Sequence, residues 1–303
     1  MGHVPVMKKE VIHYLIWDYS GTYVDCTLGD GMHSKAILKE ITPQGGTVIG
    51  IDRDSRAIST AKSNLKDYME SIKICKRRFS DLSSELPCGD KGTYHGFLFD
   101  LGLNSSRLRE PSSGFSYLED GPLDMRMSPE ERITASQLVN SLPEKELADL
   151  LYKYSDERHS RKIARAIVRA RQSEPIETTF RLRDIIFKVI KGPYRLKSVS
   201  RCFQALRISV NNEIEELVDG LSTAFRCMLN GGRLVVISYH SIEDRIVKNF
   251  IRDRRLTKNS EAGRFFKILT PKPVQPLSDE VDINPAARSA KLRAAELVVV
   301  NGD

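Results

Sequence analysis

A glycine turn followed at a distance by an aspartate gives this chain of 303 residues the pattern of a nucleoside-binding site. An apolar run over residues 22–26 leads to Gly29 and Gly31, then to a helical stretch and a second apolar run that ends on Asp52. Such a turn directs backbone N–H groups at a ligand, and an acidic residue about 20 positions later reaches ribose hydroxyls. The pattern therefore predicts a ligand site at the ends of two parallel strands.

The turn lacks the third glycine that dinucleotide sites place against a pyrophosphate, because Ser34 occupies that position. A ligand with a ribose but no pyrophosphate fits better, and S-adenosylmethionine is such a ligand. The turn therefore favours a methyltransferase over an NAD-type dehydrogenase, which is the alternative enzyme. An ordinary strand–helix turn of an α/β protein is the structural interpretation of the same residues.

A second polar position follows a later apolar run, where Asp100 comes directly after residues 97–99. Open α/β sheets bind ligands at the carboxyl ends of their strands, so this position belongs to a site. Methyl transfer to an amine requires an approach of about 3 Å in line with the breaking bond. A hydrogen-bond acceptor on the amine raises its nucleophilicity, and Asp100 or Asn104 can supply that acceptor. A helix or turn cap is the other interpretation of Asp100.

Residues 238–245 place a phenol, an imidazole and two carboxylates after a fifth apolar run. An imidazole suits proton transfer, which makes His240 a weaker candidate proton acceptor, although a structural histidine explains it equally well. Ser241, Glu243 and Asp244 have the types expected at a helix N-cap and first turn. The chain has no H-x-x-x-H pair and no G-x-S-x-G elbow, so we expect neither a metal site nor a hydrolase.

Apolar runs and helical stretches alternate over the first hundred residues, which is the pattern of a parallel sheet. Residues 105–205 instead show helical periodicity punctuated by prolines. We therefore predict one sheet domain, residues 1–104 and 206–303, that contains an inserted all-helical domain, residues 105–205.

Near the end of the chain, the sequence predicts one long helix over residues 204–229. Gly231 and Gly232 suit the left-handed cap that would end this helix. Residues 234–237 then resume the sheet, and residues 297–300 form a final edge strand.

Basic residues gather in five clusters, and the net charge of +7 is moderate for this length. Solvated helix faces explain such clusters in many proteins. Their proximity to a ligand-binding turn favours a polyanionic substrate, since phosphate neutralisation is a common use of dispersed Arg and Lys.

Five cysteines without a CxxC pair indicate reduced thiols and a cytoplasmic protein. The sequence has no apolar stretch of about 18 residues and no targeting segment, so we expect no membrane association.

The chain resembles the MraW family, the ribosomal RNA small subunit methyltransferase H family, over nearly its whole length. The order of several matching blocks, rather than any one of them, makes the resemblance specific. These blocks are residues 3–7, 25–29, 51–54, 99–102, 121–127, 203–208, 231–233 with 236–241, and 288–293.

The resemblance implies a Rossmann-like class I fold and transfer of a methyl group from S-adenosylmethionine to the N4 of one cytosine in the decoding centre of 16S ribosomal RNA. Naked 16S rRNA or the small ribosomal subunit would be the substrate, and the residues leave a homodimer open. The implied cofactor contacts are Gly29, Gly31, Met32, His33, Asp52, Phe79, Asp100 and Arg107. The cations expected to hold RNA around a flipped base are Arg126, Arg201, Arg207, Lys291 and Arg293.

The chain departs from the family pattern near the cofactor. Asp30 and Met32 stand where the family has glycines, and Arg107 stands where it has glutamine. A non-catalytic RNA-binding or ribosome-assembly factor is the alternative function. The intact Gly29, Gly31 and Asp52 disfavour that alternative, because a pure RNA-binding protein does not need them.

Overall fold

A computed structural model describes residues 5–89, 91–102, 111–128, 131–257 and 260–301. The chain forms two compact units. The sheet unit comprises Met1–Gly102 and Glu215–Asp303, and the helical unit comprises Leu103–Ile214. The predicted insertion, residues 105–205, lies within the helical unit.

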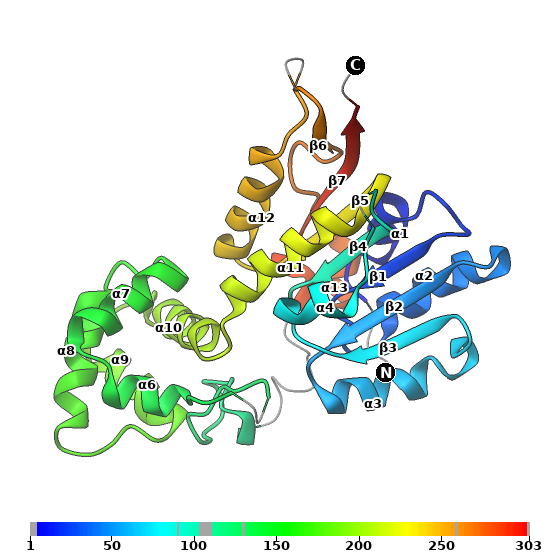
Figure 1. Ribbon diagram of the computed structural model, residues 1–303. Helices are drawn as coiled ribbons and strands as arrows, with labels where there is room; N and C mark the ends of the chain where they lie inside the picture. Colours follow the sequence, from blue (N-terminus) through cyan, green and yellow to red (C-terminus); the bar gives the residue numbers. More distant parts are fainter. Residues whose placement is uncertain (1–4, 90, 103–110, 129–130, 258–259, 302–303) are drawn as a thin grey trace. The chain divides into compact units, whose positions relative to one another are not determined.

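The described part of the sheet unit contains a seven-stranded sheet in the order β3-β2-β1-β4-β5-β7-β6 (Figure 1). Strands β1 to β5 pair in parallel, whereas β7 is antiparallel to both β5 and β6. The order reverses between β1 and β4, and such a switch point is where open α/β sheets bind ligands. The strands are β1 (Thr22–Asp25), β2 (Thr47–Asp52), β3 (Ile72–Lys76), β4 (Tyr94–Asp100), β5 (Met228–Ser238), β6 (Gly263–Ile268) and β7 (Lys291–Val300).

Helices cover both faces of this sheet (Figure 1). One apolar cluster contains residues of α1 (Lys8–Leu15), α2 (Met32–Ile41) and α3 (Ser55–Asn64). Another contains residues of α4 (Leu82–Glu85), α11 (Glu213–Cys227) and α12 (Ser241–Asp253). This three-layer arrangement confirms the predicted α/β fold class.

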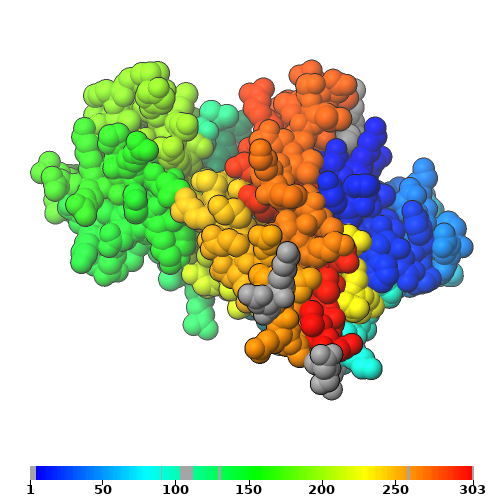
Figure 2. Space-filling view, turned by 90° about the horizontal axis from the view of Figure 1, so that it is seen from above, coloured from blue at the N-terminus to red at the C-terminus, as the bar shows by residue number. Residues whose placement is uncertain are grey.

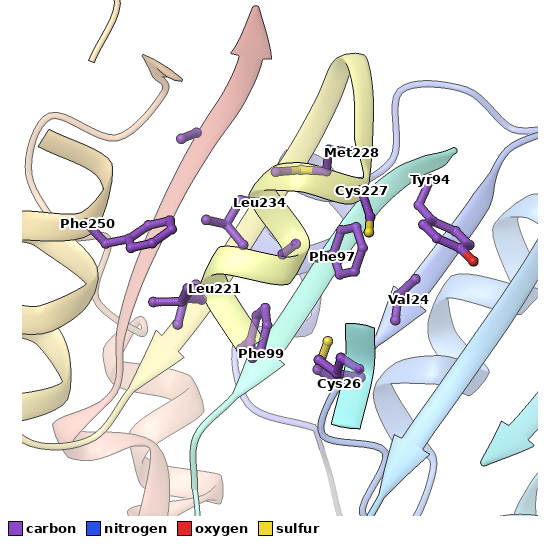
Figure 3. Packing of buried hydrophobic residues seen from close by; sticks show 14 of the residues in the cluster. Val24, Cys26, Tyr94, Phe97, Phe99, Leu221, Cys227, Met228, Leu234 and Phe250 are labelled. Atoms are coloured by element: carbon purple, nitrogen blue, oxygen red, sulfur yellow. The ribbon is translucent and has the colours of Figure 1, made fainter. Parts of the chain in front are cut away.

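Strand β4 supplies side chains to both layers. Phe97 and Phe99 belong to the cluster beneath α11 and α12, whereas Leu98 belongs to the other cluster. Successive strand residues point to opposite faces, so a strand buried on both sides reads as a continuous apolar run. Figure 3 shows Phe97 and Phe99 beside Leu221 of α11, with Phe250 of α12 in the same cluster.

The start of the sheet unit lies beside a segment near its end, and Figure 2 shows dark blue and orange segments in contact. Val6 and Met7 share an apolar cluster with Ala287 and Ala290. The Met7 N–H also donates a hydrogen bond of 2.6 Å to Glu280 Oε1 in α13 (Ser278–Ile283). The C-terminal residues thus help to hold the start of α1 on the sheet.

The helical unit has its own apolar core. Its described helices are α6 (Ala135–Ser141), α7 (Glu144–Ser155), α8 (Ser160–Arg171), α9 (Thr179–Val189) and α10 (Arg195–Val210). In the described ranges of both units, no helix is both long enough and apolar enough to cross a bilayer.

The predicted single helix over residues 204–229 is wrong, because α10 ends at Val210 and α11 begins at Glu213. Asn212 has a left-handed backbone with φ of 52°, a conformation that asparagine tolerates. The buried Asn211 fixes the break by donating to the Met125 carbonyl at 2.8 Å and accepting from the Met127 N–H at 2.7 Å.

Two further predictions near the C-terminus are wrong. Gly231 and Gly232 do not cap a helix, because strand β5 already begins at Met228. The final strand, β7, is not at the edge of the sheet, because β6 pairs with its outer side.

The expectation that all five cysteines are reduced is also wrong for this structure. Cys88 and Cys227 form a disulfide, with Cα atoms 5.1 Å apart across a sequence separation of 139 residues. Cys26, Cys75 and Cys202 are free and buried.

A thiol titration tests this pairing. Protein denatured without reductant should expose three reactive thiols of its five cysteines, and reduction should expose all five. The matched variants are Cys88→Ser, which should show four thiols with or without reductant, and Cys75→Ser, which should show two and then four. Five thiols in the unreduced parent protein would contradict the disulfide.

Candidate functional site

The carboxyl ends of β1 and β4 meet at the switch point of the sheet. Asp25 ends β1 and Asp100 ends β4, and Asp25 pairs in register with Leu98. Thr27 connects the two ends, since its hydroxyl accepts the Asp100 N–H at 2.6 Å. The backbone of the two strands is therefore fixed where the sequence predicts the ligand.

The glycine turn opens α2 directly at this point. Gly29 and Gly31 have φ values of 50° and 81°, in the left-handed region that glycine adopts easily. A Cβ on Gly31 would also lie 2.8 Å from Leu65 Cδ1. Gly31 is the N-cap of α2 and provides no side-chain bond. The first N–H groups of the helix therefore have no partner within the helix and can bind a carboxylate or another polar group.

Asp52 is part of the turn as well as a candidate ligand. Its two carboxylate oxygens accept the Gly29 N–H and the Asp54 N–H, each at 2.8 Å. Burial raises the pKa of Asp52, and these two hydrogen bonds oppose the increase. A carboxylate has about four acceptor positions, so two remain for ribose hydroxyls.

One carboxylate oxygen of Asp100 accepts a hydrogen bond, and the other faces an imidazole. The Tyr239 hydroxyl donates to Oδ1 at 2.8 Å, and His33 Nε2 lies 3.3 Å from Oδ2. Burial, followed by the charge of Asp100, raises the pKa of Tyr239 well above its ordinary value. The phenol therefore stays protonated and remains a donor to Asp100 over the working pH range.

His33 provides a test of whether the site fits a ligand. It lies in the first turn of α2 with 6% exposure, and neither ring nitrogen makes an aligned hydrogen bond with a described residue. Buried polar atoms normally have partners. An unsatisfied imidazole beside the open N–H groups of α2 therefore fits a polar ligand such as the methionine end of S-adenosylmethionine.

The aromatic side chain predicted to lie beside an adenine follows β3. Phe79 begins the short helix Phe79–Asp81 and packs edge-on against Phe99, with ring centroids 5.5 Å apart. Gly220 of α11 allows this approach, since a Cβ there would lie 3.1 Å from Phe79 Cβ. The predicted site residues Asn104 and Arg107 lie outside the described residues.

Sequence reasoning missed the residues that support the site. Ser34, interpreted only as a missing glycine, donates its hydroxyl to the fully buried Asp25 at 2.7 Å. The Thr27 N–H donates to the same carboxylate at 3.1 Å. Burial raises the pKa of Asp25, and the Ser34 bond opposes that increase. Tyr239 stands in the predicted cluster over residues 238–245, but its bond to Asp100 depends on the sheet order.

His240 lies at the same edge of the sheet and caps α12. Its Nδ1 accepts the Glu243 N–H at 3.3 Å, while Glu243 accepts the N–H groups of Tyr239 and His240. His240 Nε2 also faces Glu243 Oε1 at 3.0 Å. The N-cap of α12 is thus His240 and not Ser241. The reciprocal hydrogen bonds between His240 and Glu243 form a capping box, which fixes the backbone that carries Tyr239. Proton acceptance by His240 stays a prediction.

Each of the five cations predicted to bind RNA lies within 4 Å of a carboxylate. Three pairs lie in the helical unit: Arg126 with Asp124 at 2.8 Å, Arg201 with Glu157 at 3.6 Å, and Arg207 with Glu213 at 2.8 Å. An RNA phosphate would have to compete with these carboxylates. The RNA-binding assignment of these residues stays a prediction.

The other two cations share Asp244 of α12. Arg293, at 8% exposure, donates from Nε to Asp244 Oδ1 at 2.7 Å, and Lys291 Nζ lies 3.7 Å from Oδ2. Arg293 is therefore placed to join β7 to α12.

Removing this guanidinium should destabilise the fold. Arg293→Ala should lower the free energy of unfolding by about 3 kcal/mol, because it removes a buried guanidinium and leaves the partly buried Asp244 carboxylate without its main partner. Arg252→Ala, which removes a mostly exposed pair with Asp253, should change it by less than about 1 kcal/mol. Urea unfolding measures both values, and equal small effects would contradict a structural role for Arg293.

The sequence is similar to a known protein family and to named relatives. The model of the MraW methylase family matches residues 1–298. The ribosomal RNA small subunit methyltransferase H of Nitrobacter winogradskyi is 44% identical, covering 97% of this chain and 90% of that protein. The protein of the same name from Fervidobacterium nodosum is 43% identical, covering 98% of this chain and 97% of that protein.

Solved structures resemble the chain more distantly. A SAM-dependent O-methyltransferase from Thermotoga maritima has a TM-score of 0.44 and 10% identity, covering 100% of this chain and 69% of that chain. An rRNA methylase from Streptococcus thermophilus has a TM-score of 0.42 and 10% identity, covering 96% of this chain and 93% of that chain.

The family match agrees with the predicted enzyme class and confirms the predicted cofactor, S-adenosylmethionine. With its glycine turn at the switch point of the sheet and a family model matched from residue 1 to residue 298, this chain belongs to the MraW methylase family.

Proposed function

We propose that this protein transfers a methyl group from S-adenosylmethionine to the exocyclic N4 of a cytosine in the decoding centre of 16S ribosomal RNA. Its relatives carry the name ribosomal RNA small subunit methyltransferase H, which supports an rRNA substrate. The choice of N4 and of the decoding centre follows the family resemblance. The observation that supports an amine acceptor is Asp100, whose carboxylate is fixed beside the cofactor turn.

The reaction forms a nitrogen–carbon bond, breaks a sulfur–carbon bond and releases one proton from the amine. When bound, the cofactor supplies the activated methyl group. The amino group of cytosine has its lone pair delocalised into the ring, so it is a weak nucleophile. A carboxylate that accepts one amine N–H increases the electron density on nitrogen and can take the proton after transfer.

The proposed cofactor contacts divide by chemistry. Gly29, Gly31, Met32 and His33 hold the methionine end through the turn and the start of α2. Asp52 accepts the ribose hydroxyls, and the remaining contacts are Phe79 beside the adenine, Asp100 and Arg107.

Asp100 is the first candidate acceptor for the amine, and Asn104 is the second. His240 is the weaker candidate, because both its ring nitrogens already face Glu243. The substrate is naked 16S rRNA or the small subunit, and the target base must leave its stack to reach Asp100.

Nucleoside identification tests the proposed reaction. Purified protein is incubated with labelled S-adenosylmethionine and either naked 16S rRNA or small subunits from cells that lack the enzyme. Label in N4-methylcytidine at one position is the expected result, and the better substrate shows when in assembly the enzyme acts. Cofactor binding without transfer to either substrate would contradict the proposal and favour a non-catalytic assembly factor or another acceptor.

Tyr239→Phe tests the positioning of Asp100. Removing the hydroxyl deletes a hydrogen bond to a charged group, worth about 1.5–3 kcal/mol, so kcat should fall about tenfold or more. The dissociation constant of the cofactor should change little.

The matched control for this variant is Tyr94→Phe, which removes a partly buried hydroxyl bonded to the Pro87 carbonyl in the same unit. It should leave kcat unchanged. An equal loss in both variants, or an unchanged kcat in Tyr239→Phe, would contradict the positioning role.

A further inference from the structure

The helical unit carries a row of stacked cationic and aromatic groups along α9. The Arg183 guanidinium lies 3.6 Å from the ring centroid of Phe180 and 5.8 Å from that of Phe187. The Arg195 guanidinium, at the start of α10, lies 4.7 Å from the Phe187 centroid. We name these four residues the arginine–phenylalanine ladder. Phe180, Arg183 and Phe187 share one helix face because their spacings are three and four residues.

One end of this ladder, at Phe180, lies outside the apolar core. Phe187 packs partly against the core of the helical unit, whereas Phe180 belongs to none of the core clusters and is only half-buried. The Arg183 guanidinium is fixed by bonds from Nε to Asp184 at 3.1 Å and from Nη1 to the Tyr117 carbonyl at 3.4 Å. Fixed aromatic rings and guanidinium planes are the groups on which single-stranded RNA bases stack.

The loop that follows α9 extends this surface. All residues from 191 to 197 are exposed, and the Tyr194 side chain is among the most exposed aromatics at 71%. Gly192 turns the chain with φ of 83°, and a Cβ there would meet nothing within 4 Å. With this exposure, the Tyr194 side chain is accessible at the N-cap of α10.

Several cations flank Tyr194 in the sequence. Among the described residues, no carboxylate forms an ion pair with Lys188, Lys191, Arg195 or Lys197. The cations that the sequence assigned to RNA all have carboxylate partners, so this corner differs from them in its uncompensated charge. Uncompensated cations beside accessible rings suit a polyanion that also carries flat bases.

We propose that the corner between α9 and α10, residues 188–197 with the arginine–phenylalanine ladder, binds a single-stranded segment of the substrate RNA. Lys191 and Lys197 contact phosphates, and a base stacks on Tyr194. The proposal rests on the proposed function, which supplies an RNA substrate, and it assigns the contact to residues outside the methyl-transfer site.

Fluorescence anisotropy with the full-length protein and a labelled single-stranded RNA carrying the target cytosine tests this surface. Tyr194→Ala should weaken RNA binding about tenfold, the size expected for losing one base stack. Lys191→Ala with Lys197→Ala should also weaken it and reduce the slope of log K against log salt by about 1.4, or about 0.7 for each lost phosphate contact.

Matched controls come from α7 of the same unit. Tyr152→Ala removes a tyrosine of 59% exposure, and Lys145→Ala removes an exposed lysine. Both should leave RNA affinity unchanged. Binding of S-adenosylmethionine should be unchanged in every variant, which verifies that the sheet unit is intact.

The outcomes separate the two proposals. If the parent protein methylates RNA and the Tyr194 and lysine variants bind it like the controls, the docking surface is wrong and the proposed function stands. If only small subunits are methylated, the same comparison is made on KM for subunits, which should rise while kcat holds. Absence of any RNA binding or methylation by the parent protein would overturn the proposed function and this surface with it.

Discussion

The site depends on the hydrogen bonds that fix Asp100 at the end of β4. Its backbone N–H bonds to Thr27, which follows β1, and its carboxylate accepts from Tyr239, which follows β5. Both contacts exist because β4 lies between β1 and β5 in the sheet. The sheet order therefore joins two chain segments more than 200 residues apart around one carboxylate. The capping of α12 by His240 and Glu243 holds the turn that presents the phenol.

A buried carboxylate lies at the same edge of the sheet, and nearby hydrogen-bond donors reduce the free-energy cost of its burial. Asp25 is fully buried, and its two oxygens accept from Ser34 and Thr27. A buried carboxylate without such bonds would cost several kcal/mol. His33 lies in the first turn of α2 with its Nε2 3.3 Å from Asp100 Oδ2, so a ligand bound to its Nδ1 would be linked through the imidazole to that carboxylate.

Features set by local sequence patterns, such as strands and turns, could be predicted from the sequence. Contacts between residues far apart in the chain could not. Strands β1 to β4 follow from their apolar runs, and the turn at Gly29 and Gly31 follows from glycine chemistry. The disulfide of Cys88 joins residues 139 positions apart, and no spacing rule reveals it. Strand order and register likewise bring Arg293 to Asp244 and Tyr239 to Asp100. The residue types in the sequence do not reveal these partners.

The central claim is that the Asp100 carboxylate accepts an N–H of the target amine. Single-turnover methyl transfer by Asp100→Asn, with saturating cofactor and RNA, tests it most directly. The substitution keeps an oxygen for Tyr239 but presents an NH₂ donor or a neutral acceptor to the amine. We predict a rate about 100-fold lower than that of the parent protein, with the cofactor still bound. An unchanged rate under these conditions would contradict the account.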